Sequence, residues 1–283
     1  MIAITGASGQ LGRLVIENLL KKVPANEIVA AVRNPDKVKD LAELGVQVRH
    51  ADYDQPKTLD KAFEGVDKLL MISANEVGRR TPQHRAVIDA AKRTGVKFIA
   101  YTSLLHADKS PLPLAKEHQE TEVLLRESGI PFALLRNGWY TENYIASVPV
   151  ALQHGVLLGS AGQGRISSAA RADYAEAAVA VITGNDQAGR IYELAGGESY
   201  TLAELATEIA RRSDKEVKYQ NLPEAEFKAA LTGAGLPEWL ATLLAESDTG
   251  ASKGGLFDDS RQLSQLIGRP TTPLSTLVKQ ALQ

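Results

Sequence analysis

The chain has 283 residues, with 32 Lys plus Arg against 34 Asp plus Glu, a formal net charge of -2 and 44% apolar residues. This composition is typical of one large or two modest globular domains, and it supplies no broad basic field for nucleic-acid binding. The chain has no cysteine, which excludes disulfides, thiolate metal sites and a cysteine nucleophile.

The first half of the chain alternates short apolar runs with longer amphipathic runs. The apolar runs predict strands at Ile2–Thr5, Ile28–Val32, 46–49, 68–72, 98–102 and 132–135. Helical spacing predicts helices at 11–22, 37–43, 59–63, 84–93 and 114–127. This order predicts an α/β fold with a Rossmann-type doubly wound parallel sheet.

Beyond Asn143 the alternation ends. A glycine-rich stretch, GSAGQGR, is followed by a helix expected at 173–182, a strand at IYELA and a mostly helical tail. We expect residues 1–145 to form the Rossmann domain, joined by later returning segments. Residues 146–283 are expected to form a smaller, mostly helical lobe that binds the substrate.

The start of the chain predicts no secretion signal, because no charged segment precedes an apolar core. No later apolar run approaches the roughly 20 residues that a bilayer span needs. We therefore expect a cytoplasmic protein without a membrane partner.

The segment TGASGQLG places Gly6, Gly9 and Gly12 between the first strand and the first helix. Glycines at this junction allow a tight turn and a close approach of a pyrophosphate to the backbone. The helix amino terminus adds free N–H groups and a partial positive charge. The motif predicts a dinucleotide site, although a plain glycine turn has the same spacing.

The end of the second strand carries Arg33, where an acidic residue would hold the ribose hydroxyls of NAD. A guanidinium can pair with a 2′-phosphate through two hydrogen bonds, so NADPH (NADP) is the expected cofactor. Lys37 can add positive charge nearby. A solvated surface arginine is the alternative interpretation.

Polar side chains follow the next two strands. Asp52 and Tyr53 come after the third strand, where they can border the adenine pocket or, for Tyr53, face the nicotinamide. Asp52 can equally be a turn residue. Ser73, Ala74 and Asn75 follow the fourth strand, at the sheet edge where ligands bind in open α/β folds.

Several segments together resemble a known family. The TGASGxxG opening, Arg33, LLRNGWYTENY, RADYA, SKGGLFDDS and GRPTTPL are similar to the NmrA-like atypical short-chain dehydrogenases/reductases, in particular to their type 2 quinone-reducing members. The resemblance covers the whole chain. It implies an NADPH-binding Rossmann domain and two-electron reduction of a small-molecule quinone without flavin or metal.

The resemblance also implies site residues by position. Cofactor-binding positions correspond to Gly6, Ala7, Ser8, Gly9, Gln10, Leu11, Arg33, Ser73, Ala74, Asn75, Asn137, Gly138, Trp139, Tyr140, Thr141, Glu142 and Arg171. The quinone-side, catalytic candidates correspond to Asn143, Tyr53 and Phe257.

The chain departs from the superfamily at the catalytic dyad. Ser103 ends the fifth predicted strand, where the catalytic serine belongs, but the next helix reads LAKEHQETEVLL and has no Tyr-x-x-x-Lys. His118 and Glu122 are one helical turn apart. They can form a substitute relay, or they can be an ordinary solvated or hydrogen-bonded pair.

Reduction of a quinone does not require the missing catalytic dyad. Its reduced oxygen is phenol-like and less basic than an alkoxide, so solvent or a neutral donor can protonate it. Orientation is then the main requirement. Donors of this kind are Asn143, Tyr144 and Tyr53, and aromatic rings able to stack on the quinone or to pack in the core are Trp139, Tyr140 and Phe257.

Two other functions remain open at this stage. An NmrA-type regulator would bind NADP(H) as a redox sensor without turnover, and a reductase or epimerase would act on another carbonyl substrate. The physiological quinone and the oligomeric state do not follow from the sequence.

Overall fold

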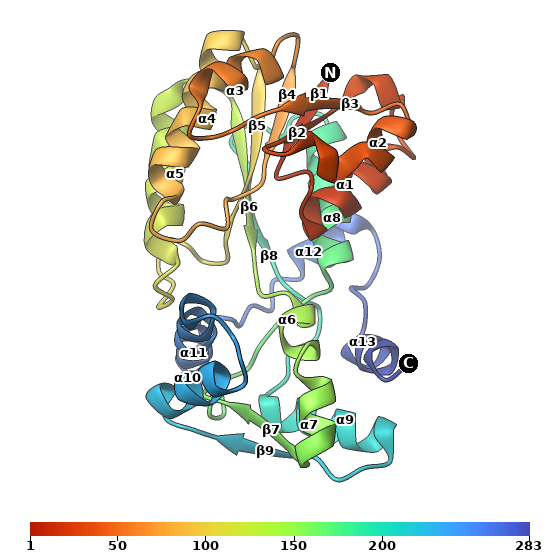
Figure 1. Ribbon diagram of the computed structural model, residues 1–283, viewed down its shortest axis with the longest axis vertical. Coiled ribbons are helices and arrows are strands. Elements are labelled where there is room, and N and C mark those ends of the chain that lie inside the picture. Colours follow the sequence, from red (N-terminus) through yellow and green to blue (C-terminus); the bar gives the residue numbers. More distant parts are fainter. The chain divides into compact units, whose positions relative to one another are not determined.

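The computed structural model describes residues 1–283 and contains two compact units. The first unit comprises Met1–Ala107, Lys116–Asn137 and Arg171–Tyr192. The second unit comprises Asp108–Ala115, Gly138–Ala170 and Glu193–Gln283. The chain therefore enters each unit more than once (Figure 1).

A seven-stranded sheet in the order β3-β2-β1-β4-β5-β6-β8 forms the centre of the first unit. Its strands are β1 (Ile2–Thr5), β2 (Ile28–Val32), β3 (Gln47–His50), β4 (Lys68–Met71), β5 (Phe98–Leu104), β6 (Phe132–Asn137) and β8 (Ile191–Leu194). All neighbours from β3 to β6 pair in parallel. The strand order reverses direction at β1, which is the point where open α/β sheets bind ligands. The predicted doubly wound α/β fold is confirmed.

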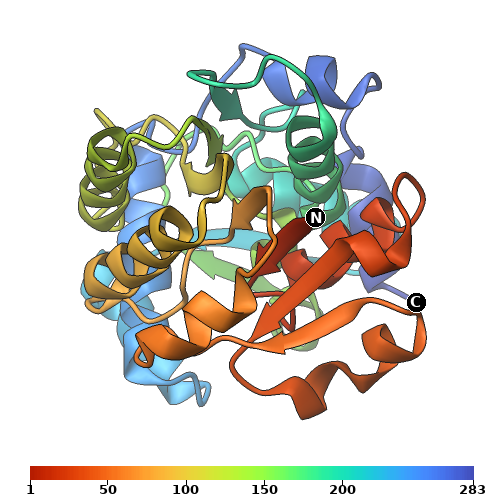
Figure 2. The same ribbon diagram turned by 90° about the horizontal axis from the view of Figure 1, so that it is seen from above.

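Helices cover both faces of this sheet. Helices α1 (Gln10–Leu19) and α8 (Arg171–Thr183) pack together on one face. Helices α3 (Pro56–Ala62), α4 (Arg80–Thr94) and α5 (Ala115–Ser128) lie on the other (Figure 1, Figure 2). The connection from β2 to β3 contains the short helices η2 (Pro35–Val38) and α2 (Lys39–Glu43), and η1 (Ala25–Glu27) precedes β2.

The core of the first unit follows from the composition of its strands. Every residue of β2 and β5 is buried, as expected for parallel strands with helices on both faces. One core cluster joins Phe63 of the segment after α3, Val87 of α4 and Leu125 of α5 to the sheet. This packing fixes the carboxyl ends of the strands, where the candidate site lies.

The second unit has a small sheet and helices. Strands β7 (Val156–Gly159) and β9 (Lys218–Asn221) pair in parallel. The helices are α6 (Thr141–Ile145), α7 (Val148–His154), α9 (Leu202–Ser213), α10 (Glu224–Gly233), α11 (Glu238–Ser252), α12 (Gln262–Ile267) and α13 (Leu274–Ala281). None of the helices in the chain combines the length and the apolar character required for a membrane span.

Candidate functional site

The glycine turn joins β1 to α1 in a conformation that only glycine accommodates easily. Gly6 has a φ of +62°, and its carbonyl accepts Gly9 N–H at 2.9 Å. A Cβ at Gly12 would lie 2.4 Å from Gly6 O and 2.7 Å from Ala7 Cα, so a larger residue cannot occupy this position without displacing the turn. Helix α1 has no side-chain cap and no acidic residue in its first turn. Its amino terminus is therefore available to an anion.

Arg33 directly follows β2, and its side chain is 69% exposed. Its NH1 pairs with Glu76 Oε1 at 2.9 Å, a partner that sequence reasoning did not identify. Lys37 is also exposed, and its carbonyl accepts a hydrogen bond from Arg13 at 2.6 Å. The end of β2 thus presents an accessible guanidinium.

The loop Ser73 to Asn75 is held through its backbone. Ser73 N–H donates to Thr102 Oγ1 at 2.9 Å, and Ala74 N–H donates to His84 Nε2 at 2.9 Å. Arg80 Nε donates to the Ala74 carbonyl at 2.5 Å. These bonds fix the path of the loop and leave the Asn75 side chain exposed.

His84 is fully buried, and its neighbours determine its tautomer. Nε2 accepts from Ala74 N–H, so it carries no proton. Nδ1 lies 2.8 Å from Thr121 Oγ1, and that hydroxyl donates to the Glu117 carbonyl at 2.8 Å, so Nδ1 is the donor. Burial, followed by the charge of Arg80, lowers the pKa of His84 to about 3. The neutral ring is a permanent acceptor for the loop.

His118 belongs to the same buried network. Arg80 NH1 lies 3.3 Å from its Nε2, and Tyr101 OH lies 2.8 Å from its Nδ1. Because a guanidinium only donates, Nε2 is the acceptor and Nδ1 carries the proton. Burial, then the charge of Arg80, lowers the pKa of His118 well below its ordinary value. His118 is buried and does not bond to Glu122, so neither the relay nor the solvated pair is formed.

Ser103 and Glu122 form a separate buried cluster. Ser103 Oγ donates to Glu122 Oε1 at 2.7 Å. Arg136 Nε donates to the same oxygen at 2.9 Å, and its NH2 donates to Oε2 at 2.8 Å. Arg126 NH2 also donates to Oε2, at 3.0 Å. The hydroxyl at the position of the superfamily's catalytic serine is therefore bonded to a paired carboxylate.

Tyr53 and Asp52 follow β3 and have different surroundings. Burial raises the pKa of the Tyr53 phenol. The Asp52 carboxylate accepts Asp54 N–H at 3.0 Å and Gln55 Nε2 at 2.8 Å. Asp52 therefore stabilises the turn before α3, which matches its interpretation as a turn residue.

Asn137 ends β6 and carries the clearest unsatisfied polar atom of the predicted set. Its Oδ1 is buried and has no hydrogen-bond partner. Buried acceptors are normally paired, so this oxygen marks a position where a ligand can supply the missing donor. Arg171 is partly buried and begins α8, in the same unit.

The predicted residues from Gly138 to Asn143 lie in the second unit. Gly138 N–H donates to the Leu194 carbonyl at 2.7 Å. Trp139 is buried, which fits its interpretation as a core residue. Residues Tyr140, Glu142 and Asn143 are partly buried, and Thr141 is buried with its hydroxyl 2.8 Å from Ser168 Oγ.

Tyr144, next to Asn143 in α6, is bonded to a buried acid. Its hydroxyl donates to Asp248 Oδ1 at 2.9 Å, and Ser160 N–H donates to Asp248 Oδ2 at 2.9 Å. Burial raises the pKa of Asp248 to about 6, against the smaller opposing effect of these two donors. The Tyr144 hydroxyl proton is thus already engaged.

Phe257 follows the turn that ends α11. Its side chain is 37% exposed. Gly254, with a φ of +82°, and Gly255 close the helix through bonds to Ala251 and Gly250. A Cβ at Gly255 would lie 2.6 Å from Leu112 Cδ1, so the turn is closely packed.

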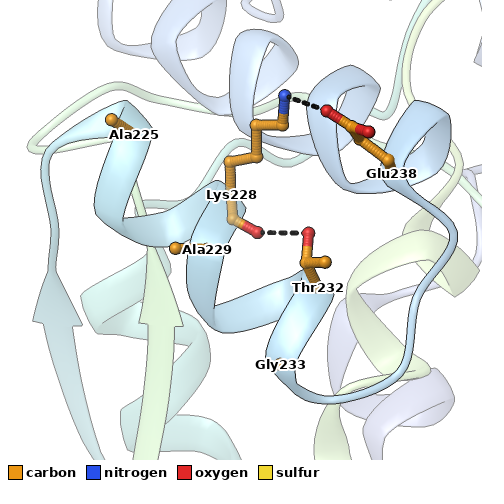
Figure 3. A pocket seen from close by; sticks show the side chains of 6 residues that line it. All are labelled: Ala225, Lys228, Ala229, Thr232, Gly233 and Glu238. Carbon is orange, nitrogen blue, oxygen red and sulfur yellow. Dashed lines mark hydrogen bonds and ion pairs between the residues drawn. The ribbon is translucent and has the colours of Figure 1, made fainter.

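A surface pocket lies elsewhere in the second unit, between α10 and α11. Figure 3 shows its lining side chains, with Lys228 Nζ paired to Glu238 Oε1 at 3.1 Å and Thr232 Oγ1 donating to the Lys228 carbonyl at 3.0 Å. The remaining lining residues are Ala225, Ala229 and Gly233. No predicted site residue lines this pocket. No group of three or more His, Cys, Asp or Glu side chains is arranged to hold a metal ion.

Sequence reasoning missed the residues that hold the loop after β4. Glu76 stands directly after Asn75, so its proximity to the predicted site was a usable signal. His84 and Arg80 gave no comparable signal, because their contacts with Ala74 depend on the path of the loop.

Comparisons with known proteins found relatives that match this chain over its whole length. A model of the NAD(P)H-binding family matches residues 6–185. Quinone oxidoreductase 2 of Escherichia coli (strain K12) is 62% identical over 278 residues, which are 98% of this chain and 97% of that protein. A crystal structure of an Escherichia coli NADPH-dependent quinone oxidoreductase complexed with NADPH matches with a TM-score of 0.98 and 61% identity over 100% of both chains. Triphenylmethane reductase of Citrobacter sp., complexed with NADP(H), matches over 100% of both chains with a TM-score of 0.97 and 42% identity.

Proposed function

The chain belongs to the NAD(P)H-binding family, and from this premise we propose that it is an NADPH-dependent quinone oxidoreductase. The observation that carries the proposal is the full-length likeness to a quinone oxidoreductase, together with a glycine turn that fits the coenzyme. The substrate is a small-molecule quinone. A cytoplasmic location remains part of this proposal.

The residues of the first unit fit the coenzyme in three places. The tight turn at Gly6 and the uncapped amino terminus of α1 suit a pyrophosphate. The exposed guanidinium of Arg33 suits a 2′-phosphate. The buried Asn137 Oδ1 has no hydrogen-bond partner in the protein and can accept a donor from the coenzyme.

The other assignments stay part of the proposal. The proposed coenzyme contacts also include Leu11, Ser73, Ala74, Asn75, Gly138, Trp139, Tyr140, Thr141, Glu142 and Arg171. The backbone bonds to His84 and Arg80 would keep the loop after β4 in one conformation when the coenzyme binds.

When bound, NADPH supplies the hydride for the reaction. The helix after β5 lacks the Tyr-x-x-x-Lys pair, and Ser103 donates to the paired Glu122 carboxylate. We assign the quinone side to Asn143, Tyr53 and Phe257. Asn143 would direct an amide N–H at the quinone oxygen, and Phe257 would offer a flat apolar surface. Solvent would supply the proton.

A steady-state assay tests the proposed function. NADPH oxidation is measured with a panel of quinones and with simple ketones as matched controls. We expect quinone-dependent oxidation without added flavin and little or no reaction with the ketones. Tight binding of both NADPH and NADP without turnover of any quinone would instead establish a redox-sensing binding protein.

A further inference from the structure

An ion pair crosses the site where the sheet changes direction. Arg33 follows β2 and Glu76 lies in the segment after β4, and these two strands flank β1. The 2.9 Å bond between Arg33 NH1 and Glu76 Oε1 therefore joins the loops on either side of the strand that leads into the glycine turn. Arg33, the residue proposed to bind the 2′-phosphate, thus has a carboxylate beside it.

The carboxylate of Glu76 is held independently of Arg33. Its Oε2 accepts Arg79 NH1 at 2.9 Å and Gln83 Nε2 at 3.1 Å. Arg79 NH2 is in turn bonded to both carboxylate oxygens of Asp54, each at 3.0 Å. Two donors other than Arg33 therefore hold the Glu76 carboxylate in place.

The two partners also differ in exposure. The Glu76 side chain is 29% exposed, whereas that of Arg33 is 69% exposed. An exposed ion pair is weak, so Arg33 can exchange or share this partner at little cost. An anion on the Arg33 guanidinium would lie well within a Debye length of the carboxylate, about 10 Å at 0.1 M salt.

We propose that Glu76 is a specificity-determining residue that limits the preference of this protein for NADPH over NADH. It acts in two ways. It occupies one N–H donor of Arg33, and its negative charge repels the 2′-phosphate. This inference rests on the proposed use of NADPH and on the assignment of Arg33 to the 2′-phosphate.

The test is the binding of each coenzyme to the Glu76→Gln variant, measured by titration calorimetry at low and high salt. The substitution keeps the shape of the side chain and removes its charge. We expect the Kd of NADPH to fall about three- to tenfold at low salt and the gain to shrink at high salt, because the effect is electrostatic. The Kd of NADH, which lacks the phosphate, should change by less than about twofold.

Two probes isolate the phosphate from the rest of the coenzyme. For 2′,5′-ADP we expect the same gain as for NADPH, and for 5′-AMP we expect none. Asp54→Asn is the matched control, because it removes a charge from the same chain of ion pairs without touching Arg33. Its effect on the Kd of NADPH should be clearly smaller.

Different outcomes overturn different statements. If Glu76→Gln leaves the Kd of NADPH unchanged, or weakens NADPH and NADH alike, Glu76 does not limit the preference and the inference is wrong. If Arg33→Ala lowers the NADPH preference while Glu76→Gln does not raise it, the proposed coenzyme stands and only the inference fails. If Arg33→Ala leaves the preference intact, both assignments fail.

Discussion

A buried carboxyl group in each unit has a shifted pKa, and the two shifts have opposite directions. Glu122 in the first unit is 2% exposed, and although burial raises its pKa, the bonds from Arg136 and Ser103 outweigh this and lower the pKa overall. Asp248 in the second unit is 3% exposed and has only Tyr144 and Ser160 as donors, so its pKa rises to about 6. Burial raises the pKa of both groups, but the pKa falls overall only at Glu122, where cations lie nearby.

The comparison also bears on the proposed chemistry. Glu122 accepts the hydrogen bond of Ser103, the residue at the superfamily's catalytic position. Asp248 accepts the hydrogen bond of Tyr144, the neighbour of Asn143. Both hydroxyls already donate inside the protein. This arrangement supports orientation, and not a dedicated acid, as the contribution of these residues to turnover.

The largest effect on stability is expected when the charge of Glu122 is removed. Glu122→Gln leaves the buried Arg136 without its counter-charge, so we expect the free energy of unfolding to fall by about 3 to 5 kcal/mol. Urea denaturation at pH 7 measures the change. Arg126→Met is the control, because Arg126 is 48% exposed and its loss should cost about 1 kcal/mol or less. Equal losses of unfolding free energy in Glu122→Gln and Arg126→Met would contradict the assignment of Arg136 as the main partner of Glu122.

Asp248→Asn should change the free energy of unfolding at neutral pH in the opposite direction. The folded protein binds the Asp248 proton more tightly than the unfolded chain, because its pKa is raised from 3.8 to about 6. This contribution is complete below about pH 4 and is lost as the pH rises through about 6. We subtract the free energy of unfolding of the wild type from that of the variant at each pH. This difference should be up to about 3 kcal/mol larger at pH 7 than at pH 4.

Urea denaturation from pH 4 to pH 8 measures this dependence. The difference in unfolding free energy between the wild type and Asp248→Asn should depend on pH. A difference between the wild type and Asp248→Asn that stays constant over this range would show that Asp248 is ionised throughout.

The functional side of the comparison predicts a rate effect. We expect Asn143→Ala to lower kcat/KM for a quinone by about 10- to 100-fold, through lost orientation and charge stabilisation. Ser103→Ala should lower it by less than about tenfold, because this hydroxyl serves Glu122. Both are measured at saturating NADPH after a check of folding. A loss of 10²- to 10⁴-fold in Ser103→Ala, the range typical of general acid catalysis, with little change in Asn143→Ala would reverse the assignment.

The smallest effect is expected for Tyr144→Phe. Removal of the hydroxyl deletes a donor that stabilises the ionised form of Asp248, so the pKa of Asp248 should rise further. The cost in unfolding free energy should be about 1 kcal/mol at neutral pH and smaller at pH 4, where Asp248 is protonated. A pH series of denaturation curves measures both. A cost that is equal at both values would argue against a bond to the charged form.

Local sequence signals predicted most elements of the first unit. The apolar runs and glycine positions placed the strands within one or two residues and located the turn at Gly6. The helix expected at 37–43 instead begins as the short helix Pro35–Val38, because Pro35 and the Asn34 side chain cap a tighter turn there. Helix α1 ends at Leu19, three residues before the expected end.

The sequence by itself determined the alternation of strands and helices, the glycine turn, the basic residue after β2 and the absence of a Tyr-x-x-x-Lys dyad. These features depend on spacing within a few residues, so they can be read along the chain. Only the tertiary structure decided which polar groups from distant parts of the chain meet. Arg33 pairs with Glu76, His84 holds Ala74, and Tyr144 reaches Asp248 across 104 positions of the chain. The partner of a buried polar group is set by the packing of separate elements, and no local pattern records it.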